Sequence, residues 1–137
     1  DKDWKEYYNN RKNHPLDQAE KVLLDNLNNI DKIGKHLILK NYQETYEFTG
    51  LFRLSKKGCK IIKDTFIKLN NKYDQNQKFE NSKSWKEAYL TDFFQYIIRN
   101  RISKINSHVI SKCWAEFDTI EDYDRLEHIK KIQKLSI

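Results

Sequence analysis

Glycine, proline and cysteine are scarce in this 137-residue sequence, and it has no long apolar run. Cys59 and Cys113 lie far apart in apolar surroundings, with no C-x-x-C spacing and no secretory leader. We therefore predict two reduced core cysteines in a cytoplasmic protein. Because no apolar stretch approaches the length of a membrane span, we predict no membrane partner.

Several signatures of nucleotide binding and catalysis are also missing. There is no P-loop, no G-x-G-x-x-G and no Ser-His-Asp arrangement, which argues against the enzyme classes that depend on them. The net charge is +6 and the pI about 9.2, which permits attraction to nucleic acid, anionic membranes or phosphorylated small molecules. Lysines alternate with acidic residues, however, so we interpret them as solvated helix faces and keep a basic RNA-binding domain as an alternative.

Aromatic residues are what the sequence has in quantity. They make up 13% of the chain and compensate for a hydrophobic content of 38%, because each ring buries a large apolar area. We expect a single ordered domain despite a charged fraction of 34%.

Apolar spacing and turn residues predict a mixed α/β layout. Pro15 and Asp17 favour the start of a helix. Capping residues are expected before three further helices, and they are Ser55, Ser84 with Glu87, and Thr119 with Asp122. The predicted helices cover residues 14–30, 56–73 and 85–101 and a final segment after 119, and the predicted strands cover residues 34–42, 46–55 and 107–118.

Two carboxylates near the end of the sequence form a candidate metal site. Glu116 and Asp118 stand two residues apart, so a strand would place both on one face. Mg²⁺ prefers one or two carboxylates together with phosphate oxygens. The alternative is structural, with Asp118 at a helix start and Glu116 on the surface.

The segment "DKDWKEYYNNRKNHPLDQAE" at residues 1–20 is dense in acids and aromatic rings. Such groups can hold a cationic head group, because ring faces attract ammonium ions. Arg11 or His14 could meet a phosphate or phosphonate. The alternative is that Trp4, Tyr7 and Tyr8 only pack on the domain.

Two further side chains are candidates for ligand contacts. Lys35 follows Gly34 and could reach a phosphoryl oxygen, although it is one solvated lysine among many. Glu47 precedes the glycine-bearing segment that contains Gly50 and could bind an amine or a sugar hydroxyl, or be a plain exposed acid.

The motifs "HPLDQAEKV", "IGK", "EFTGLFRLS", "YLTDFFQYII" and "WAEFDTIEDYDRL" occur in this order after "DKDW". Together they resemble the later part of nucleotidyltransferases of the sugar-phosphate and phosphocholine type. The closest likeness is to cytidylyltransferases that act on phosphonates such as 2-aminoethylphosphonate and accompany phosphoenolpyruvate mutase. The resemblance implies an α/β fold, the C-terminal part of a Rossmann-like nucleotidyltransferase with a mixed sheet flanked by helices.

The resemblance also implies residue roles. Glu116 and Asp118 correspond to acidic ligands of Mg²⁺, and Lys35 to the lysine on the acceptor phosphoryl group. Glu47 corresponds to the acid that reads the acceptor's polar head. The acceptor-binding segment contains Asp1, Trp4 and Arg11. The reaction implied is transfer of CMP from CTP to a phosphonate with release of pyrophosphate, and phosphocholine or a sugar 1-phosphate is the alternative acceptor.

The sequence departs from this family in lacking the G-x-G-x-R loop and the Pro-Lys pair that bind the nucleotide triphosphate. We therefore expect residues 1–137 to be the acceptor-binding and metal-completing part of one domain, inactive without a nucleotide-binding half. That half, another chain or a second copy of this one is expected to cover an apolar face.

Overall fold

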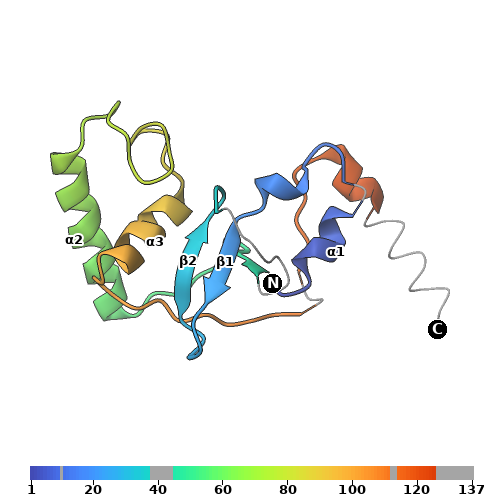
Figure 1. Ribbon diagram of the computed structural model, residues 1–137, viewed down its shortest axis with the longest axis horizontal. Coiled ribbons are helices and arrows are strands. Elements are labelled where there is room, and N and C mark those ends of the chain that lie inside the picture. The colour runs from blue at the N-terminus through green and yellow to red at the C-terminus, as the bar shows by residue number, and fades with distance from the viewer. Residues whose placement is uncertain (10, 38–44, 112–113, 126–137) are drawn as a thin grey trace.

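The computed structural model describes residues 1–9, 11–37, 45–111 and 114–125 (Figure 1). The described chain is mixed α/β, which confirms the broad fold class predicted from the sequence. A small antiparallel sheet lies at the centre, with two long helices to one side of it and α1 to the other.

The sheet contains three strands in the order β2-β1-β3. Strand β1 spans Lys21–Leu24, β2 spans Ile30–Gly34 and β3 spans Tyr46–Glu47. Lys21 at the start of β1 pairs with both Gly34 and Glu47, so β1 is the central strand. This register places Glu47 opposite Lys21, where the N-terminal residues lead into β1.

The predicted helix over residues 14–30 is wrong. Only a short 3₁₀ helix, η1 (Leu16–Gln18), forms before β1 and β2 make a hairpin. The Asp25 carboxylate accepts the N–H groups of Leu27 and Asn29, each at 2.8 Å, and so closes the connecting turn. In a helix over 14–30, Leu27 would share an apolar face with Val22 and Ile30, but at the tip of this turn it is 76% exposed.

Two of the predicted strands are much shorter than expected. In the described part of 34–42, β2 ends at Gly34 and residues 35–36 form a turn, while residues 38–42 lie outside the described residues. Of 46–55, only Tyr46–Glu47 is a strand. Because β3 pairs with β1 alone, the residues after it have no strand to continue along.

The predicted strand over residues 107–118 does not form in its described part. An extended segment instead crosses beneath the sheet (Figure 1). The Ile105 carbonyl accepts the Ile30 N–H at 2.8 Å, and the Ile110 carbonyl accepts the Lys2 N–H at 3.1 Å. These scattered backbone bonds carry the chain from α3 to the N-terminal residues without building a continuous ladder.

Helix α2 (Lys56–Lys72) begins where it was predicted. The Ser55 hydroxyl accepts the Gly58 N–H at 3.0 Å, which confirms the expected cap. The prediction of core cysteines is wrong for Cys59, which is exposed and free on this helix, and Cys113 lies outside the described residues.

Helix α3 (Leu90–Arg99) begins five residues later than predicted. Ser84 does accept the Glu87 N–H at 3.3 Å, but this contact closes a turn before the helix. The cap comes from Asp92, whose carboxylate accepts the Tyr89 N–H at 3.1 Å and the Ser82 hydroxyl at 2.6 Å. Asp92 is buried, so these two bonds also satisfy a charge that would otherwise be costly.

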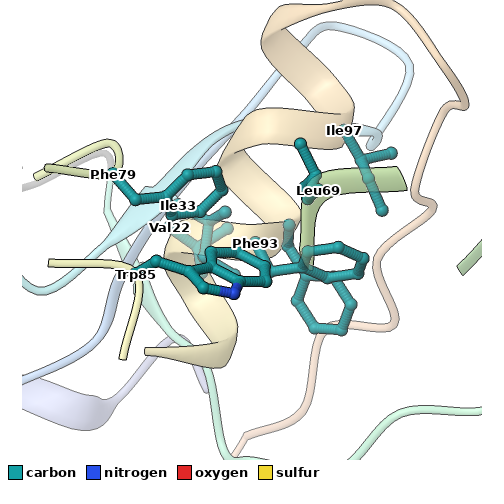
Figure 2. Packing of buried hydrophobic residues seen from close by; sticks show 8 residues of the cluster. Val22, Ile33, Leu69, Phe79, Trp85, Phe93 and Ile97 are labelled. Atoms are coloured by element: carbon teal, nitrogen blue, oxygen red, sulfur yellow. The ribbon is translucent and has the colours of Figure 1, made fainter. Parts of the chain in front are cut away.

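The main hydrophobic core lies between α2, α3 and one face of the sheet (Figure 2). Phe79 and Trp85 come from the polar loop before α3, yet they are buried with ring centroids 4.7 Å apart. The buried members of this core are Val22, Ile33, Leu69, Phe79, Trp85, Phe93, Phe94 and Ile97. A second, smaller cluster of Trp4, Tyr8 and Ala19 supports α1 (Trp4–Tyr8).

Across the described ranges, the helices are too short or too polar for any of them to cross a membrane.

Substitution of Leu69 should test the main core. Leu69 is fully buried on α2, so Leu69→Ala should lower the free energy of unfolding by about 2–5 kcal/mol through lost burial and a cavity. Ile67→Ala is the control on the same helix. Ile67 is 47% exposed, so its replacement should cost less than about 1 kcal/mol. Urea unfolding measures both, and equal losses would contradict this core.

Candidate functional site

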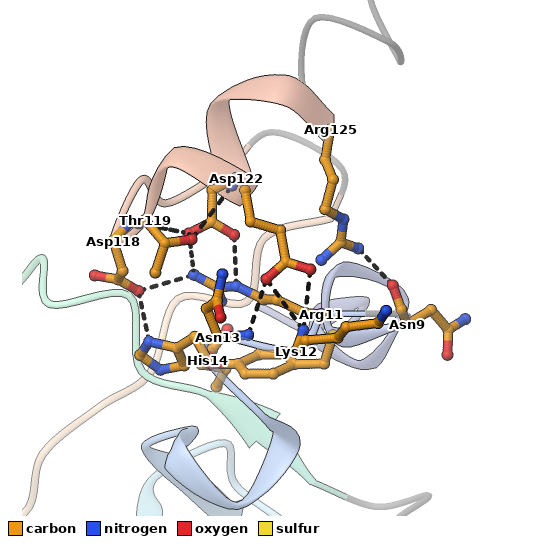
Figure 3. A network of polar contacts seen from close by, with 12 residues as sticks. Asn9, Arg11, Lys12, Asn13, His14, Asp118, Thr119, Asp122 and Arg125 are labelled. Carbon is orange, nitrogen blue, oxygen red and sulfur yellow. Dashed lines mark hydrogen bonds and ion pairs between the residues drawn. The ribbon is translucent and has the colours of Figure 1, made fainter.

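The two ends of the described chain meet at the buried side chain of Arg11 (Figure 3). Its Nε donates to Asp122 Oδ1 at 2.6 Å, and its Nη2 donates to Asp122 Oδ2 at 2.8 Å and to Asp118 Oδ2 at 2.9 Å. The fork of the guanidinium matches the carboxylate, which makes the Arg11–Asp122 pair strong and directional. Arg11 therefore joins segments more than 100 positions apart in the sequence.

The partner segment is prepared for this contact by a helix cap. Helical backbone begins at residue 120, as the Thr119 and Asp122 pattern predicted. The Asp122 carboxylate accepts the Thr119 N–H at 2.9 Å, and the Thr119 hydroxyl accepts the Asp122 N–H at 3.3 Å. Burial opposes ionisation, but hydrogen bonds from Arg11 and Thr119 outweigh it and lower the pKa of Asp122 to about 2.

Further contacts fix the loop on either side of Arg11 (Figure 3). The Glu121 carboxylate accepts the backbone N–H groups of Lys12 and Asn13, at 3.0 and 2.9 Å. His14 Nδ1 then lies 3.0 Å from Asp118 Oδ2, the oxygen that also receives Arg11. Asp118 is one-third exposed, so the loop brings an accessible carboxylate next to two nitrogen donors.

Glu47 is attached to the same region through α1. The Tyr8 hydroxyl donates to Glu47 Oε1 at 2.5 Å. The Arg11 guanidinium lies over the Tyr8 ring, 5.1 Å from the ring centroid. Burial raises the pKa of Glu47 to about 7, the Tyr8 hydrogen bond opposes that rise, and the nearby charge of Glu116 adds to it.

Asp1 and Trp4 hold the backbone around Glu47. The Asp1 nitrogen donates to the Glu47 carbonyl at 2.6 Å, and the Glu47 N–H donates to the Asp1 carbonyl at 2.9 Å. The Trp4 indole donates to the Thr45 carbonyl at 2.9 Å and is fully buried. Both residues therefore hold the backbone at and next to Glu47. Trp4 exposes no surface that a ligand could contact.

Glu116 lies within electrostatic reach of most of these charges. Burial raises its pKa, the neighbouring Asp118 raises it further, and His14 and Arg11 lower it. It makes no hydrogen bond among the residues that the structure describes, so its carboxylate is available. The expected strand that would put Glu116 and Asp118 on one face does not form; the helix cap at Asp122 holds Asp118 instead.

Glu20 connects Lys35 to this region. It accepts the Thr91 hydroxyl at 3.3 Å. Burial raises the pKa of Glu20, the positive charge of Lys35 lowers it, and the charge of Glu116 raises it. Lys35 and Glu116 thus both act on Glu20, one from the turn after β2 and the other from the far end of the chain.

The predicted site residues come together only in part. Arg11, Glu47, Glu116 and Asp118 share one electrostatic region, Lys35 borders it, and Asp1 and Trp4 lie beneath it. Sequence reasoning assigned no role to Glu20 and left two roles open for Tyr8, a ring face for a cationic group or packing on the domain. The pair Ala19-Glu20 in "HPLDQAE" was the available signal for Glu20. Because a helix was predicted over 14–30, the side on which Glu20 lies could not be inferred from it.

The donor set fits Mg²⁺ only as a partial site. No cluster of three or more metal-binding side chains occurs in residues 1–9, 11–37, 45–111 and 114–125. Glu116 and Asp118 still form an interacting pair of hard oxygen ligands. Two carboxylates are compatible with Mg²⁺ where substrate phosphates and water complete the coordination.

An open apolar groove of about 1120 Å³ lies next to Glu47, and Asp1, Tyr46 and Phe48 also line it. Segments 48–55 and 103–110 form its rims, and Leu51 and Phe52 on one rim are 71% and 51% exposed. Apolar residues along its floor include Val22, Leu24, Ile30, Phe48, Ile62 and Phe94. A groove of this size with exposed apolar side chains is a candidate interaction surface. That a missing half or another chain covers an apolar face stays a prediction.

Comparisons of the chain with protein-family models, with curated proteins and with solved structures gave no match.

Breaking the Arg11–Asp122 pair should destabilise the protein strongly. Asp122→Asn keeps the side-chain shape but leaves the Arg11 guanidinium buried with an incomplete set of acceptors, which should cost about 3–5 kcal/mol. Asp124→Asn, the same change two residues away on the exposed surface, should cost less than about 0.5 kcal/mol. Urea unfolding at neutral pH compares the two variants, and a small loss for Asp122→Asn would show that the pair is dispensable.

The raised pKa of Glu47 predicts a specific pH dependence of stability. The folded chain binds the Glu47 proton more tightly than the unfolded chain between pH 4.5 and about 7. The Glu47 contribution therefore favours folding at the low end and is lost as the pH rises through this window. Glu47→Gln should remove this decline, while Glu6→Gln at an exposed position of α1 should retain it.

The measurement is the free energy of urea unfolding at several pH values between 4 and 8 for the three proteins. Identical slopes for wild type and Glu47→Gln would contradict the proton-binding role of Glu47.

Proposed function

We propose that this chain is the acceptor-binding part of a cytidylyltransferase that transfers CMP from CTP to a phosphonate such as 2-aminoethylphosphonate. The observation that carries the proposal is the convergence of Arg11, Glu47, Glu116 and Asp118 through contacts at Arg11 and Tyr8. Four residues that the family resemblance selected from distant motifs thereby belong to one small region. In the proposed whole enzyme, the three-stranded antiparallel sheet is one part of a Rossmann-like nucleotidyltransferase.

The charge pattern supports an acceptor with a cation at one end and an anion at the other. Glu47 and Glu116 make one side of the region negative and suited to an ammonium group. The Tyr8 ring is buried beneath the Arg11 guanidinium, so its part in this proposal is to hold Glu47 through its hydroxyl. Lys35, on the other side of Glu20, supplies the positive charge for a phosphonate oxygen.

Glu116 and Asp118 would hold Mg²⁺, which when bound neutralises charge on the phosphate oxygens. Asp118 is oriented for this role by Arg11 and His14, which both contact its Oδ2 atom. The Nε and Nη2 groups of Arg11 donate to Asp118 and Asp122, and its side chain is only 4% exposed, so in this proposal it orients the site and does not touch the acceptor.

The reaction needs little proton transfer. A phosphonate oxygen attacks the α-phosphorus of CTP, a new P–O bond forms, and the bond between the α-phosphorus and the bridging oxygen breaks. Pyrophosphate leaves with that electron pair. Because the phosphonate is ionised at neutral pH, it needs no general base, and the side chains contribute mainly by positioning the two substrates.

CTP binding requires residues that this sequence does not contain, since it lacks the G-x-G-x-R loop and the Pro-Lys pair. We propose that a nucleotide-binding half, in the same polypeptide or another chain, packs in the apolar groove beside Glu47. The groove supports this because its lining is largely apolar and includes the exposed side chains of Leu51 and Phe52.

Acceptor binding tests the proposal on the chain itself. NMR titration with 2-aminoethylphosphonate should shift signals of residues around Glu47 and Lys35, and Glu47→Gln should weaken binding because it removes the charge that pairs with the ammonium group. Phosphocholine and glucose 1-phosphate run in parallel. A preference for either would change the acceptor class, and no binding of any of the three would contradict the proposal.

Pyrophosphate release tests the reaction, with the chain joined to a nucleotide-binding half and supplied with CTP, Mg²⁺ and 2-aminoethylphosphonate. Asp118→Asn should lower the rate about 100-fold or more, since metal neutralisation contributes several kcal/mol to the transition state. Asp124→Asn is the control for the loss of one negative charge and should keep the wild-type rate. Equal rates in both variants would exclude Asp118 from the chemistry.

A further inference from the structure

The Lys35 side chain has an aromatic partner that the proposed reaction does not explain. Its Nζ lies 4.9 Å from the centroid of the Tyr89 ring. This is within the range over which a ring face attracts an ammonium ion. Tyr89 immediately precedes α3, so the contact joins the turn after β2 to the start of that helix.

The backbone of Lys35 is also fixed. Lys21 is 4% exposed, and its Nζ donates to the Lys35 carbonyl at 2.9 Å and to the Asp17 carbonyl at 3.3 Å. Because Lys21 sits at the start of the central strand, it ties the turn that carries Lys35 to the sheet. A buried ammonium is retained here only through such contacts, so this arrangement should hold the turn firmly.

Tyr89 is fixed by its own backbone. Its N–H donates to Asp92 at 3.1 Å, and Asp92 is buried and also accepts the Ser82 hydroxyl. The Tyr89 ring itself is 43% exposed and thus lies at the surface. The ring is therefore a supported platform whose removal leaves the cap of α3 in place.

A carboxylate completes the surroundings of Lys35. Glu20 is within electrostatic reach of Lys35, and the Thr91 hydroxyl from the first turn of α3 holds it at 3.3 Å. The charge of Glu116 also acts on Glu20. Lys35 thus contacts the Tyr89 ring and interacts with the negative charge of Glu20. Both partners are held at the start of α3.

We propose that Tyr89 is a positioning residue that holds the Lys35 ammonium toward the region of Glu20 and Glu116, where it meets the phosphonate oxygens of the acceptor. This inference rests on the proposed function. Without the ring, the flexible lysine side chain samples more rotamers in water, and ordering it on ligand binding costs entropy. Tyr89 therefore increases acceptor affinity through Lys35 without touching the acceptor.

Two variants separate the ring from the hydroxyl. Tyr89→Phe keeps the ring face and Tyr89→Leu removes it, and the backbone cap is unchanged in both. In proton–carbon NMR spectra, the Lys35 Hε signals should show an upfield ring-current shift in wild type and Tyr89→Phe that is lost in Tyr89→Leu. Urea unfolding of each variant confirms that the fold is intact.

Binding of 2-aminoethylphosphonate to the same proteins gives the functional readout. Tyr89→Leu should raise the dissociation constant about two- to fivefold, the size of an exposed cation–π contact, and Tyr89→Phe should change it less than about twofold. In a Lys35→Ala background, Tyr89→Leu should have no further effect, because a positioning residue acts only through its lysine.

The outcomes distinguish this inference from the proposed function. Two results would overturn the positioning role and leave the proposed function standing. In the first, Tyr89→Leu binds 2-aminoethylphosphonate as tightly as wild type. In the second, Tyr89→Leu weakens binding by the same factor in the Lys35→Ala background as in wild type. If wild type binds no phosphonate, the proposed function fails and the role of Tyr89 in it fails as well.

Discussion

The bidentate pairing of Arg11 with Asp122 is the contact on which the candidate site depends. It brings the residues after α1 against the helix cap at 119–122, and the Nη2 atom of the pair also donates to Asp118. Burying a guanidinium and a carboxylate costs desolvation energy, which good geometry and further hydrogen bonds must offset. Here Thr119 and the backbone N–H of Asp118 supply those bonds. If the N-terminal segment and the helix cap were apart, Asp118 and Glu116 would lose their neighbours Arg11 and His14.

Acidic groups beyond this pair are held in less favourable surroundings. Burial raises the pKa of Glu47, Glu116 and Glu20, and Glu116 adds to the rise at the other two. Each of these carboxylates would be better solvated in the unfolded chain, so the region opposes folding at neutral pH. Concentrations of perturbed carboxylates are more frequent at functional sites than elsewhere, because a bound cation or metal relieves the repulsion.

Stability must therefore come from outside the site. The main core between α2, α3 and the sheet contains most of the buried aromatic rings, and the smaller Trp4 and Tyr8 cluster supports α1. Strand β1 connects the two, since Val22 faces the main core while Lys21 pairs with Glu47 and holds the turn at Lys35. The site is consequently built at the edges of a well-packed core and its side chains remain partly open to solvent.

Local sequence by itself determined the elements whose contacts span a few residues. The cap at Ser55 with α2, and the Thr119–Asp122 cap, follow from side chains that bond to backbone three positions away. The hairpin over 21–34 could not be read in this way, because Val22, Leu27 and Ile30 stand at helical spacing and the local pattern favours a helix there. Pairing with β3 and packing on α3 decided for strands instead. Tertiary structure alone brought Arg11 to Asp122, Tyr8 to Glu47 and Tyr89 to Lys35, since charge and ring contacts between distant residues depend on where the chain returns and leave no periodicity in the sequence.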